Sequence, residues 1–205
     1  ALIADPQQLV RHPDIDVIVE TIGGTTAARD LVLEAIAHGK HVVTANKALL
    51  ALHGNEIFAA ADARGVCVAY EGAVAVSIPI VKALREGLAA NRINWLVGIV
   101  NGTSNFILTR MRDTRCPFAD AVKEAQRLGY AEADPTLDIG GIDAGHKLAL
   151  LASLAFGMPL QFGDITIEGI STVQPIDQLL AARLGYEIKS LAVARRQSEG
   201  VELSV

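Results

Sequence analysis

The chain has 205 residues, of which 51% are hydrophobic, 20% are charged and 4% are aromatic. This length suits one large domain or two small ones, and the composition is that of a globular protein, which excludes intrinsic disorder. The formal net charge of −5 gives no electrostatic reason to bind nucleic acid or an anionic membrane surface.

Strand and helix signals alternate through the first third of the chain. Short apolar runs predict three buried strands, at Asp16–Glu20, His41–Thr44 and Val66–Tyr70. The stretches between them predict two helices, at Ala27–His38 and Lys47–Ala63. Strands at this spacing, joined by helices, predict an α/β fold with a parallel sheet.

The pattern changes after about residue 71, so we expect a domain boundary near residues 70–75. Helices are predicted in four later segments: Ile78–Leu88, Ser104–Met111, Phe118–Leu128 and Asp143–Phe156. Strands are predicted in four more: Arg92–Val100, Ile165–Ile167, Ile188–Ala194 and Val201–Val205. The last two are expected to form a hairpin across residues 195–200.

Polar turns follow the three predicted parallel strands, at residues 20–24, 44–47 and 71–73. Ligands of open α/β sheets bind outside the carboxyl ends of the strands, so these turns are candidates for one edge of a site. Gly23 and Gly24 can bring backbone N–H groups close to a nucleotide. The sequence contains no GxGxxG motif, however, and the glycines taken alone favour a plain strand-to-helix turn.

Two helix starts carry polar residues. Asn46 is a predicted N-cap, and Lys47 then faces an unfavourable helix dipole. This lysine is either placed for function or simply exposed on the surface. In the polar loop Asn101–Asn105, Ser104 or Thr103 is predicted to cap the next helix, and no function is assigned to the loop at this point.

The segment from residue 129 to residue 147 is the richest in chemistry. Four carboxylates precede a nearly all-apolar helix: Glu132, Asp134, Asp138 and Asp143. Asp143 and Lys147 are spaced i, i+4, so they lie on one helical face and can pair. A lysine held by carboxylates in a cleft can move a proton on or off a substrate oxygen, and the acids suit a substrate ammonium. A capped helix with a surface ion pair is the alternative.

Other chemistries have little support. Cys67 and Cys116 cannot form a disulfide framework and lack metal-ligand spacing, so we expect a reducing cytoplasm. The five histidines are scattered without ligand spacing.

The longest apolar run, Leu148–Leu160, is shorter than the ~20 residues of a membrane span, and the first residues do not form a signal peptide. A start without Met and an ending in a strand-like pattern predict a piece of a longer protein.

Read together, these stretches resemble homoserine dehydrogenase over nearly the whole chain. The most specific blocks are Thr44-Ala-Asn-Lys47, Asn101-Gly-Thr103 and Gly129-Tyr-Ala-Glu-Ala-Asp-Pro135. The resemblance implies part of a Rossmann-type parallel sheet in residues 1–72, followed by a mixed α/β substrate-binding and dimerisation domain in residues 73–205. The family's glycine-rich first turn is expected upstream of residue 1, and a later segment downstream of residue 205.

The resemblance also implies an activity and a set of site residues. The activity is the reversible, NAD- or NADP-dependent reduction of L-aspartate 4-semialdehyde to L-homoserine by a cytoplasmic homodimer, in threonine, methionine and isoleucine biosynthesis. Lys147 would be the acid/base lysine near the substrate oxygen, and Lys47 would be a second catalytic-site lysine that lines the site. Substrate would be bound by Glu132, Asp138 and Asp143. The cofactor would lie along Thr21, Gly23, Lys47 and Gly129. A monovalent cation, sodium, would be held by backbone carbonyls of Glu71, Val74, Val76 and Ile78, although Val76-Ser77 stands where the family often has glycines.

Two rival interpretations remain open. The first is another Rossmann oxidoreductase, for which the acidic loop containing Glu132 would be unimportant. The second is a non-catalytic remnant that serves only as a dimerising module.

Overall fold

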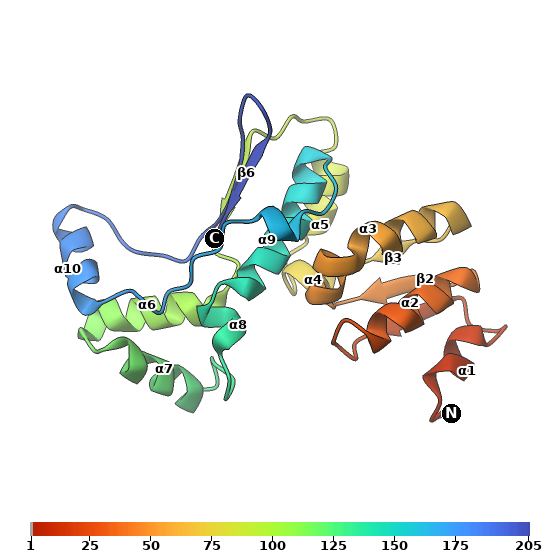
Figure 1. The fold of residues 1–205 in the computed structure, drawn as a ribbon, viewed down its shortest axis with the longest axis horizontal. Coiled ribbons are helices and arrows are strands. Elements are labelled where there is room, and N and C mark those ends of the chain that lie inside the picture. The colour runs from red at the N-terminus through yellow and green to blue at the C-terminus, as the bar shows by residue number, and fades with distance from the viewer. Residues whose placement is uncertain (1) are drawn as a thin grey trace. The chain divides into compact units, whose positions relative to one another are not determined.

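The computed structural model describes residues 2–205, which form two compact units (Figure 1). One unit contains the chain up to Arg92 together with Ala149–Phe162. The other contains Ile93–Leu148 and Gly163–Val205. Each unit has its own three-stranded sheet.

The first unit is built on a parallel sheet, which confirms the predicted α/β class. Its strands are β1 (Val17–Glu20), β2 (His41–Thr44) and β3 (Val68–Ala69), hydrogen-bonded in the order β1-β2-β3. The third strand is shorter than the predicted run 66–70. Along β1 and β2 the side chains alternate between a buried face, with Ile18 and Val42, and an exposed face, with Val17 and Val19.

Helices α2 (Ala27–Ala37) and α3 (Lys47–Arg64) link these strands at the predicted places. The unit also contains α1 (Pro6–Arg11) before β1 and, after β3, α4 (Glu71–Val74), α5 (Ile80–Lys82) and a π-helical turn, η1 (Ala83–Gly87). Helix α3 ends at Gly65, whose φ of 71° is the left-handed conformation that glycine adopts at little cost. The predicted helix 78–88 begins two residues later than expected, after Pro79.

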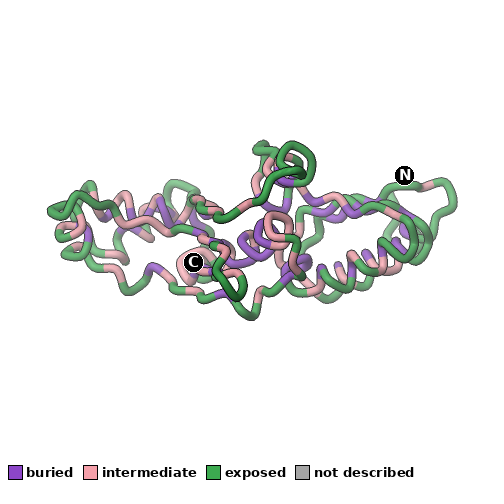
Figure 2. Tube along the Cα trace, turned by 90° about the horizontal axis from the view of Figure 1, so that it is seen from above, coloured by how far each residue is buried: buried purple, intermediate pink, exposed green. Residues whose placement is uncertain are grey.

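The core of the first unit is aliphatic. Figure 2 shows its buried residues, which come from the strands and from the helices beside them. The largest fully buried side chains of this unit are Val32, Ile36, Val42, Leu49, Leu50 and Ile57, with Leu150 from the returning segment. Burying such side chains stabilises the unit by about 1.5–3 kcal/mol each, before the entropy cost of ordering the chain.

The second unit carries an antiparallel sheet of β4 (Trp95–Gly98), β5 (Ala192–Arg196) and β6 (Val201–Ser204). The predicted hairpin is present, but β5 extends through Arg196, two residues beyond the expected end. Arg195 lies opposite Glu202 on the exposed face, where charged side chains cost little. The predicted strand 165–167 is reduced to a single parallel bridge from Thr166 to Ser204.

Helices complete the second unit. They are α6 (Gly102–Thr114), α7 (Phe118–Arg127), α8 (Thr136–Ile139), the first part of α9 (Ile142–Phe156), and α10 (Pro175–Arg183); a short 3-10 turn, η2 (Phe162–Asp164), lies at the boundary. Ile107, Leu108 and Met111 of α6 pack with Ala121 and Ala125 of α7. Within residues 2–205, no helix has the length and apolar character needed to cross a membrane.

Candidate functional site

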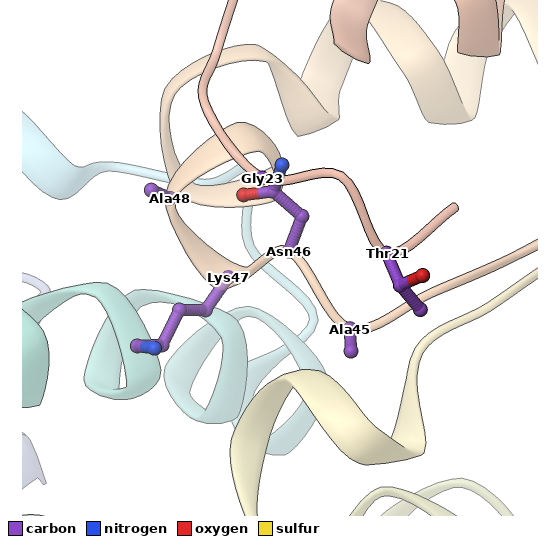
Figure 3. Close-up of a pocket in the computed structure, with 6 residues that line it drawn as sticks. All are labelled: Thr21, Gly23, Ala45, Asn46, Lys47 and Ala48. Atoms are coloured by element: carbon purple, nitrogen blue, oxygen red, sulfur yellow. The ribbon is translucent and has the colours of Figure 1, made fainter.

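In the first unit, the turns that follow β1 and β2 line a cavity of about 220 Å³ (Figure 3). Its lining residues are Thr21, Gly23, Ala45, Asn46, Lys47 and Ala48. The third turn is adjacent, because a Cβ at Gly72 would lie 3.6 Å from that of Ala45. The structure therefore brings Thr21, Gly23 and Lys47 to one edge of the sheet.

A buried carboxylate holds the first two turns together. Glu20 is only 5% exposed, and it accepts hydrogen bonds from Ile22 N (2.9 Å), Gly23 N (3.1 Å) and Thr44 Oγ1 (2.5 Å). The Gly23 N–H is therefore engaged inside the protein, although the sequence suggests it as a nucleotide contact. Glu20 was not singled out from the sequence. A carboxylate that ends a buried strand is the signal that points to it, since such a group needs donors.

Asn46 joins the same turns from the other side. Its side-chain oxygen accepts the Leu49 N–H at 3.0 Å and caps α3 as predicted, while its amide donates to the Gly24 carbonyl at 2.7 Å. Figure 3 shows the Asn46 side chain directed toward the glycine turn, and the Lys47 side chain extending away from it. The cavity thus has a fixed polar wall on one side and a half-buried lysine on the other.

In the second unit, Lys147 is held by two acceptors. Its ammonium lies 2.8 Å from Asp143 Oδ2, one turn earlier on α9, and donates to the Val100 carbonyl at 2.7 Å. The two side chains are only 18% and 13% exposed. The predicted i, i+4 pair is confirmed, and it is largely buried. Within residues 2–205, the third N–H of Lys147 has no hydrogen-bond acceptor, so it can donate to a ligand.

Asn101 stands beside this ion pair. Its amide nitrogen donates to Asp138 Oδ1 at 2.7 Å and to Asp143 Oδ2 at 3.0 Å, and its side-chain oxygen accepts the Ser104 N–H at 2.8 Å. Helix α6 therefore begins at Gly102 and is capped by Asn101, so the prediction of a Ser104 or Thr103 cap was wrong. The Ser104 hydroxyl instead donates to the Asp138 carbonyl at 2.8 Å.

The remaining acids of the loop lie apart from this cluster. Glu132 is exposed, and its side chain has no hydrogen bond or ion pair in the part of the chain that the structure describes. The Thr136 hydroxyl and backbone N–H donate to Asp134 and hold the pKa of its carboxyl below the ordinary value. Gly129, with φ at 79°, follows the last residues of α7. Of the predicted substrate residues, Asp138 and Asp143 are brought together.

The loop expected to hold a cation begins at α4. The Glu71 carboxylate accepts the N–H groups of Val81 and Lys82, at 2.8 and 2.9 Å, and so caps α5. Val74 is buried, whereas Val76 and Ile78 are exposed, and the Ile78 carbonyl already accepts the Ile80 N–H at 2.8 Å. Within residues 2–205, no three His, Cys, Asp or Glu side chains are grouped to hold a metal ion. Cation binding here would depend on backbone carbonyls.

Comparison with protein families matches the chain in two consecutive parts. A family model described as "Homoserine dehydrogenase, NAD binding domain" matches residues 1–71, and one described as "Homoserine dehydrogenase" matches residues 79–205. Together they account for almost the entire chain.

Individual relatives agree. The chain is 61% identical to a homoserine dehydrogenase of Pseudomonas aeruginosa, over all of this chain and 47% of that protein. It is similar to the crystal structure of a homoserine dehydrogenase from Thiobacillus denitrificans, with 61% identity and a TM-score of 0.97 over 98% of this chain and 47% of that one. It also resembles a hyperthermophilic archaeal homoserine dehydrogenase in complex with NADPH, at 28% identity and a TM-score of 0.80, over 97% of this chain and 58% of that one. The chain spans about half the length of the curated relatives it matches.

Proposed function

This chain belongs to the homoserine dehydrogenase family, and we propose that the protein catalyses the reversible reduction of L-aspartate 4-semialdehyde to L-homoserine with NADPH or NADH. The observation that carries the proposal is the largely buried Lys147–Asp143 pair with Asp138 beside it. A proton donor and a pair of carboxylates, held by one network, match an aldehyde substrate that also carries an ammonium group.

Lys147 is the proton donor for the substrate oxygen in this proposal. Two of its three N–H groups are committed to Val100 O and Asp143 Oδ2, which fixes the direction of the third. That N–H stabilises the negative charge that develops on the aldehyde oxygen and then passes its proton to it. In the reverse direction the neutral amine of Lys147 takes the proton from the homoserine hydroxyl.

Asp138 and Asp143 bind the substrate ammonium in this proposal, joined by Glu132 from the exposed part of the loop. Charge-assisted hydrogen bonds from an ammonium to carboxylates are among the stronger ones in proteins. This pairing would distinguish the amino aldehyde from a plain aldehyde of the same length. It also orients the aldehyde end with respect to Lys147.

The cavity of the first unit fits a nicotinamide cofactor. Gly23 and Gly24 have positive φ, and a Cβ built on either would meet no atom within 4 Å, so a flat ring can approach the backbone there. Thr21, Gly23 and Lys47 line the cavity, and Gly129 joins them by family resemblance. When bound, the reduced nicotinamide supplies a hydride to the aldehyde carbon. We assign residues 1–72 to this nucleotide-binding domain and residues 73–205 to the substrate-binding and dimerisation domain.

A sodium ion at the 71–78 loop is a further part of the proposal. Backbone carbonyls of Glu71, Val74, Val76 and Ile78 are hard oxygen ligands of the kind that monovalent cations take, and bound carbonyls keep a second lone pair. The Glu71 side chain is occupied at the start of α5, so it serves to fix the loop rather than to bind the ion.

We also propose a homodimer that acts in the cytoplasm. Trp95, Val97 and Ile99 are 62%, 44% and 56% exposed, at alternate positions of one strand and its continuation. They form an apolar surface on one face of the antiparallel sheet, and a large exposed apolar surface of this kind typically marks a contact with another protein. A second copy provides a self-complementary partner through two-fold symmetry.

The test follows oxidation of NADPH and of NADH by the complete protein that carries this chain. L-aspartate 4-semialdehyde is compared with succinate semialdehyde, which lacks only the ammonium group. We expect kcat/KM to be about 100-fold higher for the amino aldehyde, as loss of a charged hydrogen-bonding group predicts. Equal turnover of both aldehydes would favour another oxidoreductase. A folded dimer with no turnover of either would favour the non-catalytic module.

A further inference from the structure

We propose that Asn101 is a positioning residue, which aligns the two substrate-binding carboxylates and the proton-donating lysine through a single peptide segment. The inference rests on the proposed function, because it concerns the roles given there to Asp138, Asp143 and Lys147. Asn101 does not touch the substrate in this proposal. It acts through the groups that do.

The geometry places Asn101 at the centre of the cluster. It is 4% exposed, and both hydrogens of its amide are used, one on Asp138 Oδ1 (2.7 Å) and one on Asp143 Oδ2 (3.0 Å). The carbonyl of the preceding residue, Val100, accepts from Lys147 Nζ at 2.7 Å. Residues 100 and 101 therefore contact all three charged groups.

The charges explain why an amide is needed. Asp138 comes from α8, and Asp143 and Lys147 come from α9; within residues 2–205, no other charged side chain is hydrogen-bonded to Asn101. Two carboxylates close together repel each other, and Lys147 is ion-paired with Asp143. An amide that donates to both holds one oxygen of each carboxylate at the same place, where the two groups can pair with an ammonium ligand.

Asn101 also caps helix α6, and this contact fixes the orientation of its side chain. Its Oδ1 caps α6 through the Ser104 N–H at 2.8 Å. The amide group can then point only toward the carboxylates. Among cap-forming side chains, aspartate and serine accept as well as asparagine does, but neither carries two donors.

The experiment compares Asn101→Asp with Asn105→Asp in the complete protein. Both asparagines are buried in the same helix region, and both donate through Nδ2 to two acceptors; those of Asn105 are the carbonyls of Asn101 and Ser190. Asn105 contacts no charged group by a hydrogen bond within residues 2–205. Both variants are expected to lose thermal stability, so stability alone does not distinguish them.

Kinetics distinguish them. For Asn101→Asp we expect kcat/KM for L-aspartate 4-semialdehyde to fall about 100-fold at pH 7, with KM for NADPH unchanged. The acidic limb of the pH profile of kcat/KM should move to higher pH by about one unit or more. The variant places a third carboxylate beside two others, and their mutual repulsion keeps one of the three protonated up to a higher pH. For Asn105→Asp we expect no shift of the acidic limb and no change in the ratio of KM for the semialdehyde to KM for NADPH.

Asn101→Ser is the second variant, since it keeps the cap and one donor. It should give a smaller loss, without the shift of the acidic limb. The inference is overturned if Asn101→Asp has the same pH profile and the same KM values as Asn105→Asp. Absence of semialdehyde turnover in the unsubstituted protein would instead contradict the proposed function, and the inference with it.

Discussion

Lys147 Nζ lies 2.8 Å from Asp143 Oδ2, one helical turn earlier on α9, and both side chains are more than four-fifths buried. An exposed pair at this spacing contributes a few tenths of a kcal/mol. A largely buried pair is different, because removal of one partner leaves the other charge in a poorly solvated place. This pair is therefore expected to be important for function, and its disruption should be costly.

Lys147→Met should lower kcat for semialdehyde reduction by about 10²- to 10⁴-fold, the usual contribution of a positioned proton donor. The measurement is steady-state oxidation of NADPH over a range of semialdehyde concentrations. Lys123→Met is the control, since Lys123 is 78% exposed on α7 and should leave kcat unchanged. A kcat within threefold of the unsubstituted enzyme would show that Lys147 is not the donor.

Glu20→Ala should lower the free energy of unfolding by about 2–3 kcal/mol, because three donors of the first two turns lose their shared acceptor. KM for the cofactor should rise, because Thr21 and Gly23 line the cavity. Urea unfolding and cofactor titration measure the two effects. Glu56→Ala removes an exposed partner of Arg29 and should change neither. An unchanged cofactor KM in Glu20→Ala would contradict the role of the turn.

Ser77→Gly should raise the free energy of unfolding by about 1 kcal/mol. Ser77 has a φ of 67°, a left-handed conformation that is unfavourable for a residue with a Cβ and easy for glycine. Ser77→Ala keeps the Cβ and should show no gain, and the exposed position makes both changes otherwise mild. Equal stability of the two variants would mean that the loop relaxes around Ser77 at no cost. Sodium titration of both variants would also test cation binding by the loop.

Tyr70→Phe should make the protein less sensitive to alkaline pH. Burial raises the pKa of the Tyr70 hydroxyl above its ordinary value of 10.0, so the unfolded chain releases this proton at lower pH than the folded chain does. The folded state then binds more protons than the unfolded state, and stability declines as pH rises from about 10 through the folded pKa. Unfolding followed between pH 9 and 11 should show a shallower decline for Tyr70→Phe than for Tyr186→Phe, which alters an exposed tyrosine. If the stabilities of the two variants decline in parallel with pH, the Tyr70 hydroxyl does not contribute to the alkaline sensitivity.

Trp95→Glu should dissociate the proposed dimer, because it places a charge on the exposed apolar face of β4. Sedimentation velocity at micromolar concentration gives the mass of the species in solution. Leu52→Glu, at a similarly exposed position on α3, should leave the mass unchanged. If Trp95→Glu retains the dimer mass, the contact lies elsewhere.

Local rules were enough to predict the features that depend on neighbours in sequence. The pairing of Asp143 with Lys147 follows from helical spacing, and the capping of α3 by Asn46 follows from its place before an apolar helix. The parallel strands β1 and β2 lie within their predicted runs, although only alternate side chains of each are buried.

Features that depend on distant partners were missed. Asn101 was not singled out because two of its acceptors, on Asp138 and Asp143, lie about forty residues further along the chain. Helix α10 was also missed, although Gln174 and Asp177 form a capping box around Pro175. Its exposed surface is as apolar as its buried one, so no helical periodicity marks it.

The link between β4 and α6 has only three residues, from Ile99 to Asn101, and two of them hold the charged cluster. In the proposed function, the charged cluster therefore constrains the length of this link as much as the fold does. An inserted or deleted residue would move the Val100 carbonyl, the Asn101 amide or both away from their partners. The hairpin turn 197–200 in the same sheet is exposed, and its backbone hydrogen bond, from Gln197 N to Gly200 O, lies within the turn itself. We expect related sequences to vary in length at the hairpin turn and to keep the shorter link unchanged.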